Sequence, residues 1–144
     1  MFLHPFASVR RSSPAPSFNF RAIGYVESSP ANEASTDDVL DESLLVLEPD
    51  VTGGLDGVVP GDRLLVVFVF DRAEECELRQ HPKGDPLRTL RGVFALRSPR
   101  RPNPIGVTVV EVLKIAGNAV WVRGLDAWPG TPILDLKLET KEER

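Results

Sequence analysis

The sequence predicts an all-β protein, and three observations support that prediction. Apolar residues fall into about seven short runs of strand length, separated by turn residues at regular spacing. No segment shows the three-and-four spacing of apolar residues that marks a long amphipathic helix. The longest apolar run, residues 64–70, has the length of a strand and is far too short to span a membrane.

Length and composition indicate a single ordinary globular domain. The chain has 144 residues, of which 42% are apolar and 26% are charged. We expect a folded domain over residues 18–140, a disordered N-terminal tail over 1–17 and a short C-terminal tail over 141–144. The N-terminal tail has the arginine and serine of a transit peptide but lacks the continuous apolar core of a secretory signal.

Cysteine and histidine counts bear on compartment and on metals. The single cysteine, Cys76, cannot form an internal disulfide, which predicts a reducing compartment and a cytoplasmic protein. Two histidines and one cysteine are too few for a zinc site of the usual kind, so no metal is expected. Because histidine as a residue type suits proton transfer near neutral pH, His81 is a candidate general base, although a lone loop histidine is more often incidental.

Charge is unevenly distributed along the chain. The net charge is −4, yet residues 79–101 hold seven basic residues and one acid, so the remainder is strongly acidic. A basic segment on an acidic body predicts affinity for a polyanion on one face. The alternative is that a long loop takes up arginine for solubility.

The first half of the chain predicts three strands in order. Residues 18–26 alternate apolar and polar and predict a half-buried strand, and the acidic stretch 27–42 predicts a long loop. Residues 43–48 predict a short strand. The glycines of 52–57 predict a turn or a single helical turn, because no Gly-Lys-Ser/Thr follows as a phosphate-binding loop requires. The continuous apolar run 64–70 predicts a central strand covered on both faces.

The second half predicts a polar insertion and then three more strands. The insertion occupies residues 75–90. Alternation predicts strands over 105–115 and 119–125, joined by a hairpin turn at Ala116-Gly117-Asn118. A proline-containing loop over 126–132 leads to a last strand over 133–138.

The most informative stretch is R-G-V-F-A-L-R-S-P-R-R-P-N-P-I-G-V-T, residues 91–108, in which an apolar strand-like run ends in a loop of arginines and prolines. Ser98, Arg101 and Asn103 each precede a proline, so the loop should be stiff and extended. Guanidinium groups on such a frame suit carboxylate or phosphate recognition, whereas the alternative is a solvated surface turn. The arginines of the loop are Arg97, Arg100 and Arg101.

This stretch resembles the signature of the TsaA-like family, also called TrmO. F-R-A-I-G-Y-V resembles the first strand of the family and G-L-D-A-W-P-G-T-P-I-L-D-L-K its closing strand pair, so the resemblance covers residues 18–138. It implies a small closed or nearly closed β-barrel that binds S-adenosylmethionine. It further implies methylation of N6-threonylcarbamoyladenosine beside a tRNA anticodon, and a homodimer. The extra C-terminal domain of some bacterial members is not expected here.

The resemblance and side-chain chemistry suggest roles for individual residues. Arg97 suits the cofactor carboxylate, and Asp126 or Asp71 suits the ribose and sulfonium. Asp126 is the expected general base, unless water mediates the transfer, and Asn103 would orient the amine. Trp128 stacks on a base or caps the barrel. The expected cofactor-binding residues are Asp71, Arg72, Arg97, Ser98, Val107, Asp126, Ala127, Gly130 and Thr131. The expected phosphate contacts are Arg88, Arg91, Arg100 and Arg101.

Three alternatives remain open at this point. Many family members carry histidine where this chain has Asp71, which allows a non-catalytic module that only holds the cofactor. The same aspartate can pair with Arg72 in solvent instead of binding a ligand. The acidic body also allows methylation of a small metabolite in place of tRNA.

Overall fold

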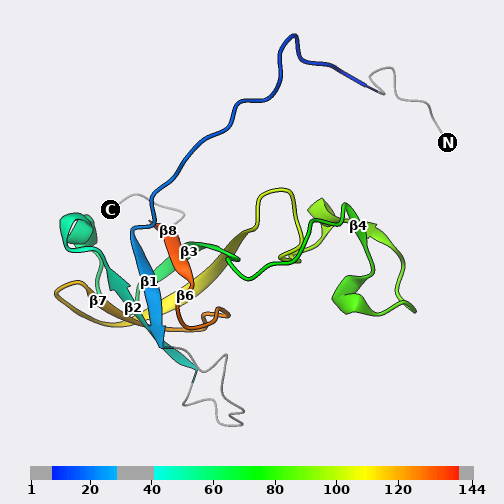
Figure 1. The fold of residues 1–144 in the computed structure, drawn as a ribbon. Helices are drawn as coiled ribbons and strands as arrows, with labels where there is room; N and C mark the ends of the chain where they lie inside the picture. Colours follow the sequence, from blue (N-terminus) through cyan, green and yellow to red (C-terminus); the bar gives the residue numbers. More distant parts are fainter. Residues whose placement is uncertain (1–7, 29–40, 140–144) are drawn as a thin grey trace.

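A computed structural model describes residues 8–28 and 41–139, and its centre is a closed barrel of antiparallel strands (Figure 1). The barrel strands are β1 (Gly24–Ser28), β2 (Glu42–Leu47), β3 (Arg63–Val69), β6 (Ile105–Ala116), β7 (Ala119–Arg123) and β8 (Pro132–Leu138). Their order around the barrel is β1-β2-β7-β6-β3-β8, and β8 pairs with β1 to close it. The predicted all-β fold and small closed barrel are confirmed, with these six strands in the barrel.

The barrel interior is filled by alternate residues of each strand. Leu64, Val66 and Phe68 of β3 are buried, whereas the residues between them are only half-buried. The predicted burial of both faces of this strand is therefore wrong, because a barrel strand has one face inside and one outside. Among the described residues, no helix combines the length and apolar character that crossing a bilayer requires.

The predicted hairpin turn joins β6 and β7, and it has two residues between the paired strand ends. Ala116 pairs with Ala119, and Gly117 takes a φ of 59°, which a glycine adopts without steric cost. The Asn118 side-chain amide donates to the carbonyl of Leu47 at 2.8 Å, and the Leu47 amide donates to the carbonyl of Asn118 at 2.8 Å. These bonds attach the turn to the end of β2.

The first strand is shorter than the sequence predicts. It begins at Gly24, and Phe18 and Phe20 are exposed to 73% and 75%. The prediction over residues 18–23 is wrong, because β1 pairs with β2 and with β8 only from Gly24 onward. Ile23, just before the strand, still donates to the Ile133 carbonyl at 2.8 Å and accepts from the Glu48 amide at 2.7 Å. After β2 the chain forms the 3-10 helix η3 (Pro49–Leu55), which confirms the predicted helical turn. The predicted loop and both predicted tails lie wholly or partly outside the described residues.

Between β3 and β6 the chain leaves the barrel as an arm, residues 71–95, and returns through the signature loop, residues 96–104 (Figure 1). In the arm, β4 (Arg79–Gln80) pairs with β5 (Arg91–Gly92). The other elements are the 3-10 helices η4 (Pro82–Gly84) and η5 (Val93–Ala95). The strand-like interpretation of the apolar run is therefore wrong beyond Gly92, since the Leu96 amide closes a helical turn on the Val93 carbonyl at 3.0 Å.

Candidate functional site

The signature loop lies against one end of the barrel, where β3 ends and β6 begins. A cleft of about 530 Å³, the rim cleft, separates them, and a side pocket of about 270 Å³ adjoins it. Asp126, from the loop after β7, lines both hollows. The other residues common to both are Phe68, Phe70 and Pro99.

Two aromatic rings form the apolar wall of the rim cleft. Phe68 and Phe70 pack edge to face, with ring centroids 5.1 Å apart. They leave no room for a side chain on the facing strand, because a Cβ on Gly106 would lie 2.5 Å from Phe68 and 2.8 Å from Phe70. The glycine that ends the motif P-N-P-I-G therefore permits this wall.

The signature loop is held by hydrogen bonds of its own. The half-buried Arg101 guanidinium donates to the carbonyls of Leu96 at 3.1 Å and Ser98 at 3.0 Å. The Ser98 hydroxyl in turn accepts the amide of Arg100 at 3.2 Å. Arg101 and Ser98 thus maintain the shape of the loop, and Arg101 has fewer donors left for an external phosphate.

Arg97 is the arginine of the loop that reaches the rim cleft. Its side chain is exposed and donates to the backbone carbonyl of Val107 in β6, which also lines the cleft. A guanidinium has five N–H donors in a fixed fork, so one bond to a carbonyl leaves donors for a carboxylate. The structure therefore brings Arg97, Val107 and Asp126 together.

The side pocket is formed by the residues after β3 and after β7. Its lining includes Asp71, and no ion pair forms between Asp71 and Arg72. Arg72 instead stacks over Trp128, with its guanidinium carbon 5.6 Å from the ring centroid. Trp128 remains 48% exposed. This pair closes one side of the pocket and leaves the Asp71 carboxylate without a paired cation among the described residues.

The loop over residues 126–132 is fixed to β1. The Gly130 amide donates to the Val26 carbonyl at 2.7 Å, with Gly130 at a φ of 87°, and the Val26 amide donates to the Thr131 carbonyl at 3.0 Å. Ala127 and Thr131 are buried and line the side pocket. Gly130 belongs to this loop, but Asn103 is exposed on the signature loop and lies outside the lining of both hollows.

The underside of the signature loop and the arm enclose a third hollow of about 820 Å³, the arm basin. Its basic lining comes from Lys83, Arg88, Arg97 and Arg100, and Asp126 lies at its border with the rim cleft. Lys83 takes the left-handed conformation, with φ 56°, which is uncommon for a residue other than glycine. The residues that complete the polar lining are Glu77, Gln80, His81 and Ser98.

The predicted phosphate contacts differ in how their charges are used. Arg100 pairs with Glu77 at 2.6 Å and with Glu74 at 4.0 Å. Arg88 has one exposed partner, Asp85 at 3.8 Å. Arg91 is exposed, makes no ion pair with any residue the structure describes, and does not line the basin.

His81 also lines the basin but is partly engaged. Its Nδ1 lies 2.8 Å from the carbonyl oxygen of Arg88, within hydrogen-bonding distance. This bond fastens the two sides of the arm, between β4 and β5. The contact gives His81 a local structural role and leaves its other ring nitrogen for a ligand.

Comparison with known proteins identifies the family. Residues 27–141 match the family described as the tRNA-methyltransferase O N-terminal domain. The chain belongs to this family. The match includes the signature loop, the arm and five of the barrel strands in full, so it covers the whole of the clefts described above.

Relatives of known sequence and structure agree with that assignment. A protein of Methanocaldococcus jannaschii, named as a probable S-adenosyl-L-methionine-binding protein, is 44% identical over 89 residues, which are 59% of this chain and 71% of that protein. One of Pyrococcus horikoshii with the same description is 40% identical over 94 residues, 62% of this chain and 67% of that protein. The crystal structure of TrmO from Pseudomonas aeruginosa is similar with a TM-score of 0.65 and 26% identity, over 90% of this chain and 61% of that one. The chain spans 56–63% of the length of the solved TrmO chains it matches.

Sequence reasoning missed several residues of this TrmO-family site. Phe68 and Phe70 were part of an apolar run and had no signal that set them apart from core residues. Gly106 was visible as the end of the signature motif, but its close approach to both rings depends on tertiary contacts. Lys83 and Gln80 had no signal beyond their place in a polar insertion.

Proposed function

We propose that this chain binds S-adenosyl-L-methionine in the rim cleft and side pocket and is an S-adenosyl-L-methionine-dependent methyltransferase. We further propose that it methylates the N6 position of a modified adenosine in tRNA. The observation that carries the proposal is the meeting of Arg97, Asp126 and the Phe68–Phe70 wall in one cleft of a TrmO-family barrel. The names of the curated relatives support the cofactor, and the family description supports the substrate.

The residues present fit the chemical groups of the cofactor. The free donors of Arg97 match a carboxylate, and the two phenylalanines with Trp128 offer apolar and aromatic surface to an adenine ring. Asp126 and Asp71 offer carboxylates to a ribose diol and to the positive charge of a sulfonium. The side pocket is lined by Ala127 and Thr131, and Gly130 belongs to the same loop. Ser98 lies on the signature loop and lines the arm basin. Arg72 borders the site through its stacking on Trp128.

Bound there, the cofactor would supply an electrophilic methyl group. Transfer is an in-line displacement, so the protein has to place the accepting nitrogen and keep water away more than it has to form a covalent bond. Asp126 lies where the rim cleft, side pocket and arm basin meet, and it would accept the proton that the N6 nitrogen loses as its bond to the methyl carbon forms. Asn103, which is exposed on the signature loop, would orient the acceptor by hydrogen bonding.

The arm basin is the part of the surface that suits a phosphate-bearing acceptor. Lys83 and Arg88 extend from the arm into its lining, and the basin adjoins Asp126. Arg91 adds an exposed cation on the neighbouring strand. Because these contacts are electrostatic, binding of tRNA should weaken steeply as salt rises. A flat salt dependence would favour a small acceptor instead.

We also propose a cytoplasmic homodimer. The outer faces of β3 and β6 carry paired apolar residues, Val67 beside Val107 and Val69 beside Ile105. Ile105 and Val107 are each 38% exposed and also line the rim cleft, so a second copy on this apolar strip would border the cofactor site. Sedimentation analysis of the wild type and of Val67→Glu would decide, because Val67 lies outside the lining of the rim cleft. A monomeric wild type contradicts this part of the proposal.

The deciding experiment is calorimetric titration of the purified chain with S-adenosyl-L-methionine. We expect saturable binding by the wild type and a loss of about tenfold or more in Arg97→Ala, since a charge-assisted bond to a carboxylate contributes about 1.5–3 kcal/mol. Arg63→Ala is the matched control, because Arg63 is an exposed arginine paired with Glu139 away from the cleft. No binding by the wild type would overturn the proposed function.

Transfer itself is tested with radiolabelled S-adenosyl-L-methionine and bulk tRNA. Label in tRNA that is lost in Asp126→Asn, at cofactor concentrations that saturate the variant, would support the methyltransferase and the base assignment. The names of the relatives as binding proteins keep a second function open, a module that holds the cofactor without transfer. Cofactor binding with no label in tRNA or in a cell extract would support that module.

A further inference from the structure

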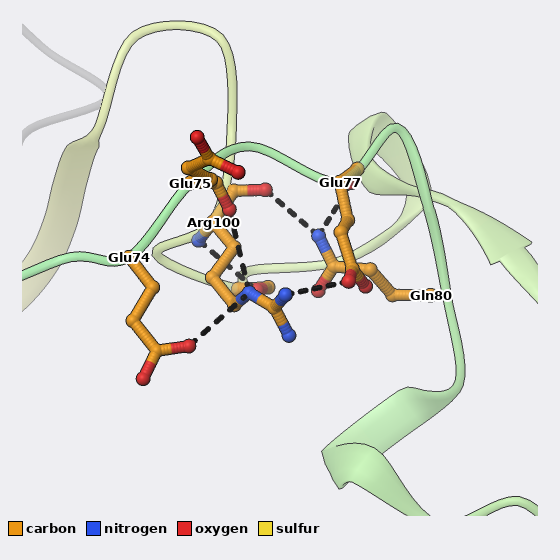
Figure 2. A network of polar contacts seen from close by, with 6 residues as sticks. Glu74, Glu75, Glu77, Gln80 and Arg100 are labelled. Carbon is orange, nitrogen blue, oxygen red and sulfur yellow. Dashed lines mark hydrogen bonds and ion pairs between the residues drawn. The ribbon is translucent and has the colours of Figure 1, made fainter.

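One polar side chain is buried in an arm that is otherwise mostly exposed. Gln80, in β4, is 9% exposed, while the residues just before it are exposed. Its side-chain nitrogen donates to the carbonyl of Glu77 at 2.6 Å and to the carbonyl of Arg100 at 2.8 Å (Figure 2). Both donors of the amide therefore have acceptors, one in the arm and one in the signature loop.

The arm also holds Arg100 through its side chain and its backbone. The guanidinium pairs with Glu77 at 2.6 Å and approaches Glu74 at 4.0 Å, and its Nε donates to the Glu75 carbonyl at 3.4 Å (Figure 2). The Glu77 amide donates back to the Arg100 carbonyl at 3.2 Å. Arg100 of the loop is thus held by side-chain and backbone contacts from Glu74, Glu75 and Glu77 of the arm.

On its other side the signature loop is attached to the barrel. Arg97 donates to the Val107 carbonyl of β6, and Arg101 joins the two halves of the loop internally. Arg97 therefore attaches the loop to the barrel and Arg100 attaches it to the arm, with only Ser98 and Pro99 between them. If the attachment to the arm is lost, only the hydrogen bond of Arg97 to β6 restrains this part of the loop, and the Arg97 guanidinium becomes more mobile.

We propose that Gln80 and Arg100 are positioning residues that clamp the signature loop to the arm and thereby hold Arg97 at the rim cleft. The clamp consists of Gln80 and Arg100 with Glu77. The affinity tests of the clamp use S-adenosyl-L-methionine, so this part of the inference rests on the proposed function. A fixed guanidinium binds a carboxylate with less loss of conformational entropy than a mobile one, so the clamp acts on affinity through Arg97.

The first test is Gln80→Glu, which keeps the shape of the side chain but turns a carboxylate toward two carbonyl oxygens. We expect the amides of Glu77 and Arg101 to exchange with solvent about tenfold faster or more, and the dissociation constant for S-adenosyl-L-methionine to rise by about tenfold, as loss of a buried hydrogen-bond donor predicts. Partial recovery of affinity at acid pH, where the new carboxyl regains a proton to donate, would distinguish this repulsion from general damage. The wild type carries no such group at this position.

The second test exchanges the charges of the ion pair. Arg100→Glu and Glu77→Arg should each weaken S-adenosyl-L-methionine binding, and the double variant should regain most of the affinity because the pair is restored with opposite polarity. Glu75→Arg is the matched control, since it makes the same charge change in the same segment and the Glu75 carboxylate makes no ion pair with Arg100. Recovery in the double variant is a result that loss of folding would not give.

Three results would overturn the clamp. One is unchanged amide exchange in Gln80→Glu, and another is equal weakening by Glu75→Arg and Glu77→Arg. The third is faster exchange with unchanged affinity, which would leave the contacts structural without a positioning role. Exchange is measured without ligand, so it still decides the clamp if the wild type fails to bind S-adenosyl-L-methionine, a result that counts against the proposed function alone.

Discussion

The barrel and the arm are held together by different forces. The barrel interior is almost entirely aliphatic, with residues such as Leu45, Val66 and Ile133 fully buried. The arm, all of which the structure describes, buries only Gln80 and Val93 over residues 71–95. Its position depends on a few polar cross-links to the signature loop. The difference indicates that stability resides in the barrel, while the shape of the site resides in hydrogen bonds that contribute little to global stability.

The same comparison changes how the basic segment is understood. Residues 79–101 hold seven basic residues and one acid in the sequence. The structure pairs Arg100 with Glu77 and Glu74, which lie just before that segment, and turns Arg97 and Arg101 onto backbone carbonyls. All three arginines of the loop thus first make contacts that hold the loop in place, and the arm basin takes its free charge mainly from Lys83.

The largest expected effect tests whether the barrel alone determines stability. Leu45→Ala should lower the free energy of unfolding by about 2–5 kcal/mol, because it leaves a cavity at a fully buried site. Leu87→Ala, the same change in the arm at a site 94% exposed, should stay within about 0.5 kcal/mol of the wild type. Chemical denaturation followed by fluorescence measures both. Equal losses would mean that the arm belongs to the cooperative core.

A smaller effect is expected inside the signature loop. Arg101→Ala leaves the carbonyls of Leu96 and Ser98 without their donor, so local opening of the loop should become easier by about 1–3 kcal/mol. Hydrogen exchange at the amide of Arg100 measures this, because that amide bonds to the Ser98 hydroxyl. Global unfolding should change less than local opening.

The control for that prediction is an arginine of the barrel. Arg63 pairs with Glu139 at 2.7 Å, and both side chains are largely exposed, so Arg63→Ala should leave exchange in the signature loop unchanged. If Arg101→Ala lowered global stability as much as local stability, the proposed separation of barrel and loop would fail.

The barrel strands could be predicted from sequence because their signal is local. Val120 and Val122 alternate with Trp121 and Arg123, and this period of two survives in the fold as inside and outside faces. The strand prediction failed over residues 18–23 because an alternating pattern does not show whether a partner strand is present. The strands of the arm were not predicted for a related reason. β4 and β5 have only two residues each and depend on pairing between residues distant in sequence.

The residues of the site also fall into those with a local sequence signal and those whose role depends on distant residues. Arg97 stood out through prolines and arginines that neighbour one another in sequence, and the resemblance to a known family supplied Asp126. The roles of Gln80 and Phe70 depend on residues 20 or more positions away, such as Arg100 and Gly106. No local pattern carries that information, because glutamine is common in polar loops and phenylalanine in apolar strands.

The smallest expected effect concerns the outer face of the barrel, where a polar interaction should alter titration without altering the fold. The charge of Glu27 raises the pKa of the Tyr25 phenol above its ordinary value, with desolvation, a hydrogen bond from the phenol to the same carboxylate and the charge of Glu48 adding to it. Since the folded state disfavours the phenolate, this group leaves stability unchanged below the ordinary pKa of tyrosine and reduces it as pH rises through that value. Glu27→Gln should therefore lower the pKa of Tyr25, and Glu48→Gln should lower it less. Ultraviolet titration measures the shift cleanly because Tyr25 is the only tyrosine of the chain. An unchanged titration in Glu27→Gln would contradict the role of the Glu27 charge. A change in stability at neutral pH would instead show that this face couples to the fold more closely than the arm does.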